Sequence, residues 1–174
     1  MICTDRLILR EMTGEDLEAL FRVLGDPDNM KHYPCAFDEA RVRSWIERNK
    51  ERYRTFGFGL WAVCLRETGE LIGDCGLTMQ EIGGVIRPEI GYHIRRDCQR
   101  RGYASEAARA VRDWTFENTP FGAVYSYMKN TNLPSARTAL SYGCRPAGGY
   151  EDGVNGLTSV FVLTREEWER IKEK

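Results

Sequence analysis

The segment from Glu89 to Ser105 carries the strongest chemical signal in this chain of 174 residues. A strand-like stretch, Glu89-Ile90-Gly91-Tyr92-His93-Ile94, leads after four residues into Gln99-Arg100-Arg101-Gly102-Tyr103-Ala104, and a helical pattern follows. Gly102 lets the backbone approach a ligand closely, and successive N–H groups at the start of a helix attract anions. Many glycine turns only reverse the chain, so the order strand, turn, helix leaves both a phosphate site and a plain turn open.

The elements that must position this turn follow from the apolar pattern. It predicts seven strands, at about 7–9, 58–65, 71–80, 89–94, 124–128, 144–150 and 157–163. Helical spacing predicts helices at about 13–24, 38–53, 104–114 and 133–142 and a short one from 165, with Thr13, Asp38 and Asn132 as caps. This mixed order, in a chain of one domain's usual length, predicts a single α+β domain spanning residues 1–174.

The charges of the chain nearly cancel, since 25 Lys and Arg against 26 Asp and Glu give a net charge of −1. This composition lacks the basic excess of a general nucleic-acid binder. Asp5 and Arg6 interrupt the N-terminus where a signal peptide needs an apolar stretch, and no apolar run approaches membrane-spanning length. We therefore expect a cytoplasmic protein that binds neither nucleic acid nor membrane.

Six cysteines and two histidines are spread along the chain without the spacing of a metal site. No Cys-x-x-Cys pair occurs, and neither His32 nor His93 lies at ligand spacing from another histidine. We expect no bound metal and reduced thiols. Cys98 could be a nucleophile, but no partner motif accompanies it, so a buried or incidental thiol is the commoner interpretation.

The turn at 99–104 resembles the Gln/Arg-x-x-Gly-x-Gly/Ala signature of the GCN5-related N-acetyltransferase (GNAT) superfamily, and the strand at 89–94 precedes it at the spacing seen there. Thr4 to Arg10, the Asp26-Pro27 break and the strand starting at Glu89 are similar to the branch of ribosomal-protein alanine acetyltransferases, the RimJ/RimL type. The resemblance implies a central mixed, mostly antiparallel twisted sheet of about seven strands flanked by helices, with the fourth and fifth strands splayed apart. It also implies acetyl-CoA as co-substrate.

In this superfamily the pantetheine arm inserts between the splayed strands, which implies that backbone N–H groups near His93 and Ile94 meet the cofactor and the developing oxyanion. A later segment, Asn132-Leu133-Pro134-Ser135 through Tyr142-Gly143-Cys144, is similar to the family's Asn-x-x-Ser/Ala…Gly-Phe motif, although Cys144 replaces the usual phenylalanine. Asn132 and Ser135 would also fit a helix cap and a first-turn hydroxyl. The implied cofactor-binding residues are His93, Ile94, Gln99, Arg100, Arg101, Gly102, Tyr103, Ala104, Ser105, Asn132 and Ser135.

Acyl transfer to an amine needs a neutral amine, donors for the oxyanion and a proton for the leaving thiolate. Glu89 lies where related enzymes often carry a glutamate that acts as general base through water, and the alternative is a strand-end carboxylate paired with Arg87 or another cation. The tyrosine that often protonates the thiolate is absent, because its position is Ala139. Ser141, Tyr142 or water are the remaining candidates, and a thiol of pKa about 8.5 needs little help to leave.

The acceptor side is less specified by the sequence. Alternation along the strand places His93 on the same face as Glu89, so His93 is a candidate substrate-lining residue as well as a candidate packed histidine. In related enzymes the loop before the second helix flanks the acceptor groove, which makes Tyr33 and Phe37 candidates too, although aromatic residues there could equally belong to the core. Nothing in the segment distinguishes a protein N-terminus from a small-molecule amine.

These observations favour an N-acetyltransferase that moves an acetyl group from acetyl-CoA to a protein N-terminal α-amine or a small-molecule amine, by direct attack in a ternary complex. An alternative from another class is a non-catalytic acyl-CoA-binding sensor or interaction module, which the alanine at position 139 would fit. An unrelated nucleotide-binding protein is a third and weaker alternative. Exposed terminal strands make a homodimer reasonable.

Overall fold

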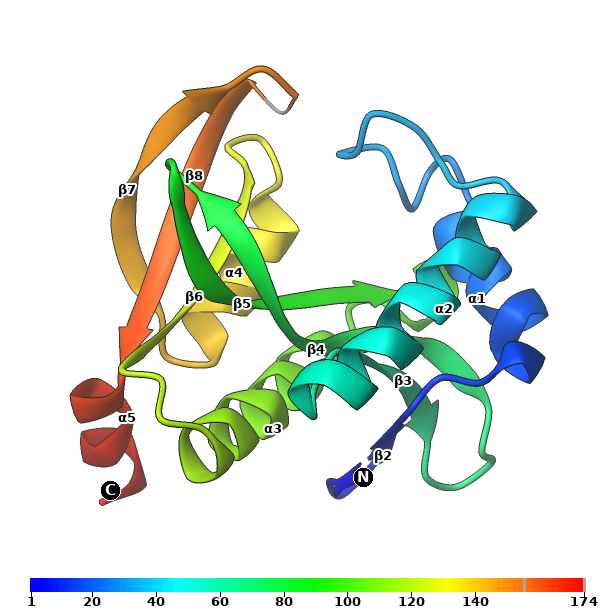
Figure 1. The fold of residues 1–174 in the computed structure, drawn as a ribbon, viewed down its shortest axis with the longest axis horizontal. Coiled ribbons are helices and arrows are strands. Elements are labelled where there is room, and N and C mark those ends of the chain that lie inside the picture. Colours follow the sequence, from blue (N-terminus) through cyan, green and yellow to red (C-terminus); the bar gives the residue numbers. More distant parts are fainter. Residues whose placement is uncertain (155, 174) are drawn as a thin grey trace.

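The computed structural model describes residues 1–154 and 156–173, and their strands form one mixed sheet flanked by helices (Figure 1). The strands are β1 (Ile2–Cys3), β2 (Leu7–Arg10), β3 (Leu60–Leu65), β4 (Leu71–Ile82), β5 (Val85–Ile94), β6 (Ala123–Lys129), β7 (Arg145–Asp152) and β8 (Gly156–Thr164). They lie in the order β1-β2-β3-β4-β5-β6-β8-β7, and each neighbouring pair is antiparallel except β5 and β6. The predicted α+β class and mostly antiparallel sheet are confirmed, with eight strands instead of about seven.

The strand that the sequence did not predict is β1, which pairs Ile2 with Leu9 and Cys3 with Ile8 of β2. Two residues are too few to show an alternating pattern in sequence. The strand β1 forms because the edge of β2 provides hydrogen-bonding partners for it. The seven predicted strands correspond to β2 through β8. Asn155 and Lys174, both within the predicted domain span, lie outside the described residues.

Two helices begin where their predicted caps Asp38 and Asn132 place them, whereas Thr13 opens a 3-10 turn and the first α-helix begins four residues after it, at Leu17. The helices are α1 (Leu17–Leu24), α2 (Glu39–Phe56), α3 (Tyr103–Asn118), α4 (Leu133–Ser141) and α5 (Arg165–Lys172), with short 3-10 turns η1 (Gly14–Asp16) and η2 (Arg96–Cys98). Asp38 accepts a first-turn N–H of α2 at 2.7 Å, Asn132 accepts one of α4 at 3.3 Å, and Thr13 forms a capping box at η1. The starts of α2 and α4 are thus determined locally by the sequence.

Alternation along the strands divides the core between the two faces of the sheet. In β3, Trp61 and Val63 belong to the larger core cluster with side chains of α3, α4 and α5, whereas Leu60, Ala62 and Cys64 belong to the smaller cluster with α1 and α2. Both faces of β3 and β4 are therefore covered, which explains why these strands are almost continuously buried.

The sheet opens between β5 and β6. Val85 to Ile94 pairs with β4 along its whole length, but among the described residues β5 pairs with β6 at one position, Glu89 opposite Tyr125. Beyond it the two parallel strands separate, and the Ser126 hydroxyl donates across the gap to the carbonyl of Ile90 at 2.8 Å. The predicted splay between the fourth and fifth predicted strands is confirmed at this junction.

Candidate functional site

A cavity of about 300 Å³ lies where β5 and β6 separate. Its walls come from both diverging strands, from α2, from the loop between α1 and α2, from the start of α4 and from Val154 near the β7–β8 turn. In Figure 1 that turn and the α1–α2 loop stand on opposite sides of the junction. Five predicted site residues line the cavity, namely Tyr33, Glu89, His93, Asn132 and Ser135.

Glu89 is held in the cavity wall without a cation in contact. Its Oε2 accepts a hydrogen bond from the Thr78 hydroxyl at 3.0 Å, while Arg87, its suggested partner, instead contacts the hydroxyl of Tyr125 at 2.5 Å and lies over that ring. Burial raises the pKa of Glu89 from 4.5 to about 7, against the smaller opposing effect of the Thr78 hydrogen bond. A carboxyl group with this pKa can both accept and release a proton near neutrality.

His93 and Asp74 form a hydrogen-bonded pair beside Glu89. The His93 Nδ1 lies 2.7 Å from the Asp74 Oδ1, and the other carboxylate oxygen accepts the indole N–H of Trp45 at 2.9 Å. The His93 Nε2 is buried and has no hydrogen-bond partner among the described residues. Burial disfavours the charged ring, but the fully buried Asp74 carboxylate outweighs this effect and raises the pKa of His93.

Sequence analysis missed Asp74, which lies directly opposite His93 in the register of β4 and β5. The available signal was a lone carboxylate within the apolar run Leu71-Ile72-Gly73-Asp74-Cys75-Gly76-Leu77, because an ionised group in such a run requires a partner. The sequence does not show that this partner is His93, because that depends on the register between β4 and β5.

The two aromatic candidates of the α1–α2 loop occupy different places. The Tyr33 ring lines the cavity, with its centroid 5.2 Å from that of His93. Phe37 is buried in the smaller core cluster, where it packs edge-on against Trp45 at 5.4 Å. Phe37 thus supports the cavity wall from behind, through Trp45.

The turn before α3 leaves the first backbone N–H groups of the helix outside the helical ladder. Arg100 and Gly102 both have left-handed backbones, with φ of 61° and 81°, and α3 begins at the next residue, Tyr103. The first helical hydrogen bond runs from the Glu106 N–H to the Gly102 carbonyl at 3.0 Å, so the N–H groups of 103–105 precede the helical ladder. Free N–H groups at a helix start, next to two exposed arginines, fit a pyrophosphate.

Arg6 braces this turn from the N-terminal strand. Its guanidinium donates to the Arg101 carbonyl at 2.9 Å, pairs with Glu106 at 2.6 Å and lies over the Tyr103 ring at 4.6 Å. Thr4 donates to the same Glu106 carboxylate at 2.6 Å. These contacts connect the Thr4–Arg10 segment to the turn and to the first residues of α3.

Gln99 closes the other end of the turn. Its side-chain amide donates to the Ile94 carbonyl at 2.9 Å and to the Asn29 side chain at 2.5 Å. The Gln99 side chain therefore connects the end of β5 to the α1–α2 loop. The neighbouring Cys98 is buried, and burial raises the pKa of its thiol, which opposes the formation of a nucleophilic thiolate.

The start of α4 is tied to β5 across the opening. The Tyr92 hydroxyl donates to the Ser135 carbonyl at 2.8 Å, and the Ser135 hydroxyl donates back to Tyr92 at 3.2 Å. Since Asn132 caps the same helix, the cap interpretation is confirmed, while contact of Asn132 and Ser135 with a cofactor stays a prediction.

The candidate acids lie at different depths. Ala139 is fully buried, and so is Tyr142, whose hydroxyl lies 2.8 Å from the hydroxyl of Ser126 in the cavity wall. Burial raises the pKa of Tyr142 well above its usual value. Ser141 is exposed, hydrogen-bonds to Ser105 in the first turn of α3 at 2.7 Å, and is not among the cavity-lining residues.

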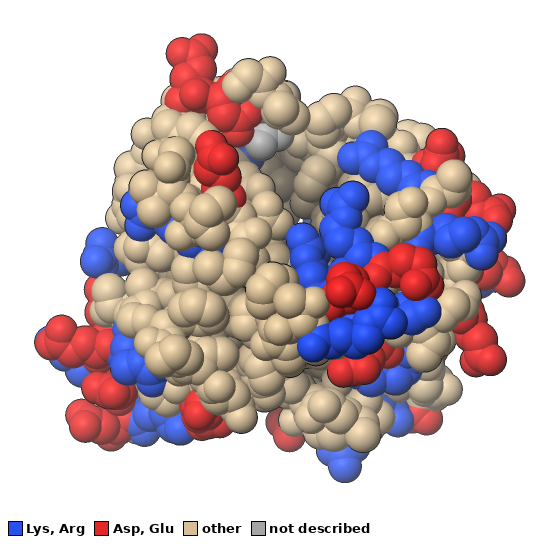
Figure 2. All heavy atoms as spheres, viewed as in Figure 1, with Lys and Arg blue, Asp and Glu red and all other residues tan. Residues whose placement is uncertain are grey.

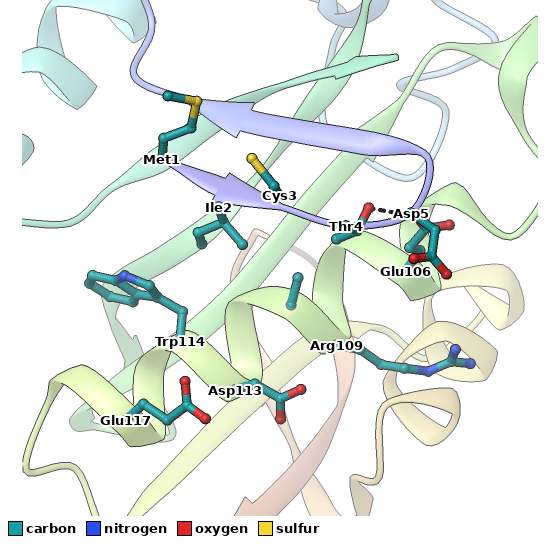
Figure 3. A pocket seen from close by; sticks show the side chains of 11 residues that line it. Met1, Ile2, Cys3, Thr4, Asp5, Glu106, Arg109, Asp113, Trp114 and Glu117 are labelled. Atoms are coloured by element: carbon teal, nitrogen blue, oxygen red, sulfur yellow. Dashed lines mark hydrogen bonds between the residues drawn. The ribbon is translucent and has the colours of Figure 1, made fainter. Parts of the chain in front are cut away.

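A second hollow, of about 480 Å³, lies between β1 and α3 (Figure 3). Its lining includes Trp114, Arg109 and Glu106, and the dashed line in Figure 3 marks the bond from Thr4 to Glu106. None of the predicted site residues lines it. The cavity at the β5–β6 junction is therefore the candidate active site.

Two searches of the described residues gave no candidates. No helix there is long and apolar enough to cross a membrane. Within the same residues, no three His, Cys, Asp or Glu side chains are grouped so that they could hold a metal ion.

Known proteins resemble this chain over most of its length. Residues 6–145 match the family model described as an acetyltransferase (GNAT) domain. The chain is 36% identical over 143 residues to the uncharacterized protein YkkB of Bacillus subtilis, covering 82% of this chain and 83% of YkkB. It is 29% identical over 174 residues to the uncharacterized N-acetyltransferase YnaD of the same species, covering 96% and 98%. A GNAT-family acetyltransferase from Bacillus anthracis has a similar structure, with TM-score 0.81, 25% identity and coverage of 95% and 98%.

Proposed function

Since this chain belongs to the GNAT family of acetyltransferases, we propose that it uses acetyl-CoA to acetylate a primary amine, by direct attack in a ternary complex. The observation that carries the proposal is the opening between β5 and β6, where a cavity contains Glu89 and His93 of β5, the strand that leads to the turn before α3. A thioester placed in that opening would meet an amine in the cavity. Such positioning supplies a large share of the rate of acyl transfer.

The turn is the proposed anchor of the coenzyme. Backbone N–H groups from Gln99 to Ser105, with the side chains of Arg100 and Arg101, would hold the pyrophosphate. The pantetheine arm would run into the opening, along the backbone of His93 and Ile94 on one side and past Asn132 and Ser135 on the other. Backbone N–H groups of β5 would stabilise the oxyanion.

Glu89 is the proposed general base. The amine nitrogen attacks the thioester carbonyl, its proton passes to the Glu89 carboxylate directly or through water, and the C–S bond breaks to release the coenzyme as a thiolate. A pKa of about 7 suits this task, because the carboxylate is populated at neutral pH and is still basic enough to take the proton. Thr78 keeps the carboxylate in place.

Tyr142, Ser141 and water are the candidates for the acid that protonates the thiolate. Of the two candidates at the end of α4, Tyr142 is the better placed, because its hydroxyl connects to the cavity through Ser126, whereas Ser141 bonds to Ser105 of α3 and does not line the cavity. Its raised pKa keeps the proton on the phenol, so the Tyr142–Ser126 pair would act as a relay to solvent-derived protons. Water remains the alternative donor.

His93 and Tyr33 are proposed to contact the acceptor amine. The Nε2 of His93 is the unpartnered polar atom of this wall, and the Tyr33 ring flanks it. Phe37 would act on the acceptor only through Trp45.

The test is release of coenzyme thiol from acetyl-CoA by purified protein with a panel of primary amines, together with mass spectrometry of the acetylated products. Turnover with at least one amine is expected. Binding of acetyl-CoA without turnover of any amine would favour the alternative, a sensor or interaction module, and absence of coenzyme binding would contradict both.

Finer assignments rest on sequence motifs alone. The segments Thr4–Arg10, Asp26-Pro27 and Glu89–Tyr92 support placement in the RimJ/RimL-like branch, which would make protein N-termini candidate acceptors. We further propose that the chain acts in the cytoplasm as one domain. The outer strands β1 and β7 each leave an edge for a second copy, so a homodimer is proposed, and sedimentation equilibrium would test it.

A further inference from the structure

The charges of α2 are sorted between two sides of the helix. Every carboxylate of α2 forms an ion pair with a neighbouring basic residue of the same helix. The pairs are Glu39 with Arg43 at 3.1 Å, Glu47 with Lys50 at 2.8 Å and Glu51 with Arg54 at 2.5 Å. Three arginines, Arg41, Arg48 and Arg52, are left over.

These three arginines share a face with Trp45, because positions 41, 45, 48 and 52 follow helical spacing. Arg41 and Arg52 line the cavity. Within the described part of the chain, no carboxylate oxygen lies within 4.0 Å of their charged nitrogens or of those of Arg48. Figure 2 shows Lys and Arg side chains bordering the central hollow on the side of α2.

Arg52 is the arginine nearest to the chemistry. It is half-buried, it contacts the Asn49 side chain at 3.2 Å, and Glu89 is among the groups that act on it electrostatically. Burial and the neighbouring Arg48 lower the pKa of Arg52, because both make its positive charge less favourable. A bound anion would stabilise that charge. Arg41 lies eleven positions earlier, about 16 Å along the helix, so it faces another part of the cavity.

The cavity as a whole is therefore positive. Arg41, Arg52 and Lys129 line it, whereas Glu89 is the one carboxylate among its described lining residues. The buried Asp74 is already committed to His93 and Trp45. Figure 2 shows acidic side chains in several places, and one group of them lies at the upper left rim of the hollow.

We propose that the acceptor is a small amine that also carries an anionic group, a carboxylate or a phosphate, bound with the anion on Arg52 and the amine directed to Glu89. This inference rests on the proposed function and narrows its substrate. Guanidinium groups match carboxylate and phosphate oxygens in geometry, and a half-buried pair is stronger than an exposed one. Polyamines and aminoglycosides, which are cations throughout, would be repelled by Arg41, Arg52 and Lys129.

The experiment compares acceptors that differ only in the anion. Rates of thiol release would be measured for L-amino acids against their carboxamides, for phosphoethanolamine against ethanolamine, and for spermidine. We expect kcat/KM to be about tenfold to a hundredfold higher for the anionic member of a pair. The pair with the larger ratio shows whether the site prefers a carboxylate or a phosphate. Equal or better use of amides, ethanolamine or spermidine would overturn the inference and leave the proposed function intact.

Two arginines of one helix provide the matched variants. R52A is expected to erase the preference for the anionic member of each pair, and R52K should restore part of it. R54A is the control, because Arg54 lies two positions away, is exposed and pairs with Glu51. A preference that survives in R52A, or disappears equally in R54A, contradicts the assignment to Arg52.

Binding separates this inference from the transfer reaction. Titration calorimetry of the best amino acid into protein saturated with coenzyme A is expected to give binding that R52A weakens at least about tenfold. If no amine is turned over but this binding is found, the transfer reaction fails and the anion site stands. If the anionic amines neither bind nor react, the anion site is wrong.

Discussion

At the scale of single residues, the proposal that Glu89 is the general base predicts how the rate depends on pH. Its buried carboxyl has a pKa of about 7, so the active carboxylate forms as pH rises through neutrality. We expect kcat/KM to rise as pH increases through about 7. E89Q should lower kcat by about a hundredfold or more, and its kcat/KM should no longer rise through this pH range. E81Q, an exposed carboxyl change on the same hairpin, is the control. A rise of kcat/KM with pH that persists unchanged in E89Q would exclude Glu89 as the base.

The buried carboxyl of Glu89 should also lower the free energy of unfolding at neutral and higher pH. In the unfolded chain Glu89 ionises near 4.5, but in the fold only near 7, so its contribution to stability falls as pH rises between these values and is constant above them. E89Q avoids this cost. We expect its free energy of unfolding to exceed that of the parent by about 1–3 kcal/mol at about pH 8 and to match it at about pH 4, by urea denaturation. A gain that is equal at both pH values would contradict the burial argument.

Asp74 is a positioning residue that acts through His93. D74N removes the charge that raises the His93 pKa and leaves the burial that lowers it, so we expect the His93 pKa to fall below 6.5. NMR titration of the ring protons measures this directly, and His32, the second of two histidines, is an internal control. We also expect kcat to fall by about tenfold or more. A His93 pKa that stays raised would show that Asp74 does not control this ring.

Sequence alone identified some of these residues and not others, for a physical reason. Glu89 and His93 lie on one strand, so alternation placed them together on one face. Asp74 contacts His93 from the paired strand β4, and Arg52 reaches the cavity from the helix α2. Their positions depend on sheet register and helix packing, which no local pattern encodes.

At the scale of elements, the turn before α3 can be tested with a pair of glycines. Gly102 and Gly69 have similar left-handed backbones, with φ of 81° and 74°, and a Cβ on Gly69 would meet nothing within 4 Å. G102A and G69A should therefore lose similar stability, about 1 kcal/mol each. Only G102A should weaken coenzyme binding, because its methyl group and altered backbone interfere with the phosphate. We expect its KM for acetyl-CoA to rise about tenfold or more. Equal KM values in the two variants would remove this turn from the coenzyme site.

The elements themselves were largely predictable because most of their signals are local. Seven of the eight strands and all five helices follow from alternation, helical spacing and caps such as Asp38. The splay could not come from patterning, since Glu89 to Ile94 and Val124 to Met128 are each ordinary strands in sequence. The family resemblance supplied it, and the single pairing of Glu89 with Tyr125 confirms it.

At the scale of the whole molecule, a net charge of −1 conceals a separation of charge. Basic side chains of α2 face the cavity, the carboxylates of the same helix pair on its outer side, and one of several acidic groups lies across the hollow (Figure 2). Such a separation orients a molecule that carries both charges. A positive cavity in a nearly neutral protein attracts anions only at short range.

The charge separation predicts how salt affects acceptor use. With acetyl-CoA saturating, raising ionic strength from about 0.01 M to 0.15 M shortens the screening length from about 30 Å to 8 Å, so kcat/KM for an anionic amine should fall severalfold. The neutral carboxamide should change little, since its attraction to Arg52 is not ionic. In R52A the two acceptors should show the same weak dependence, whereas R54A should behave as the parent. Parallel salt curves for the two acceptors in the parent protein would mean that the arginines of α2 do not act on the acceptor, and another source of specificity would be required.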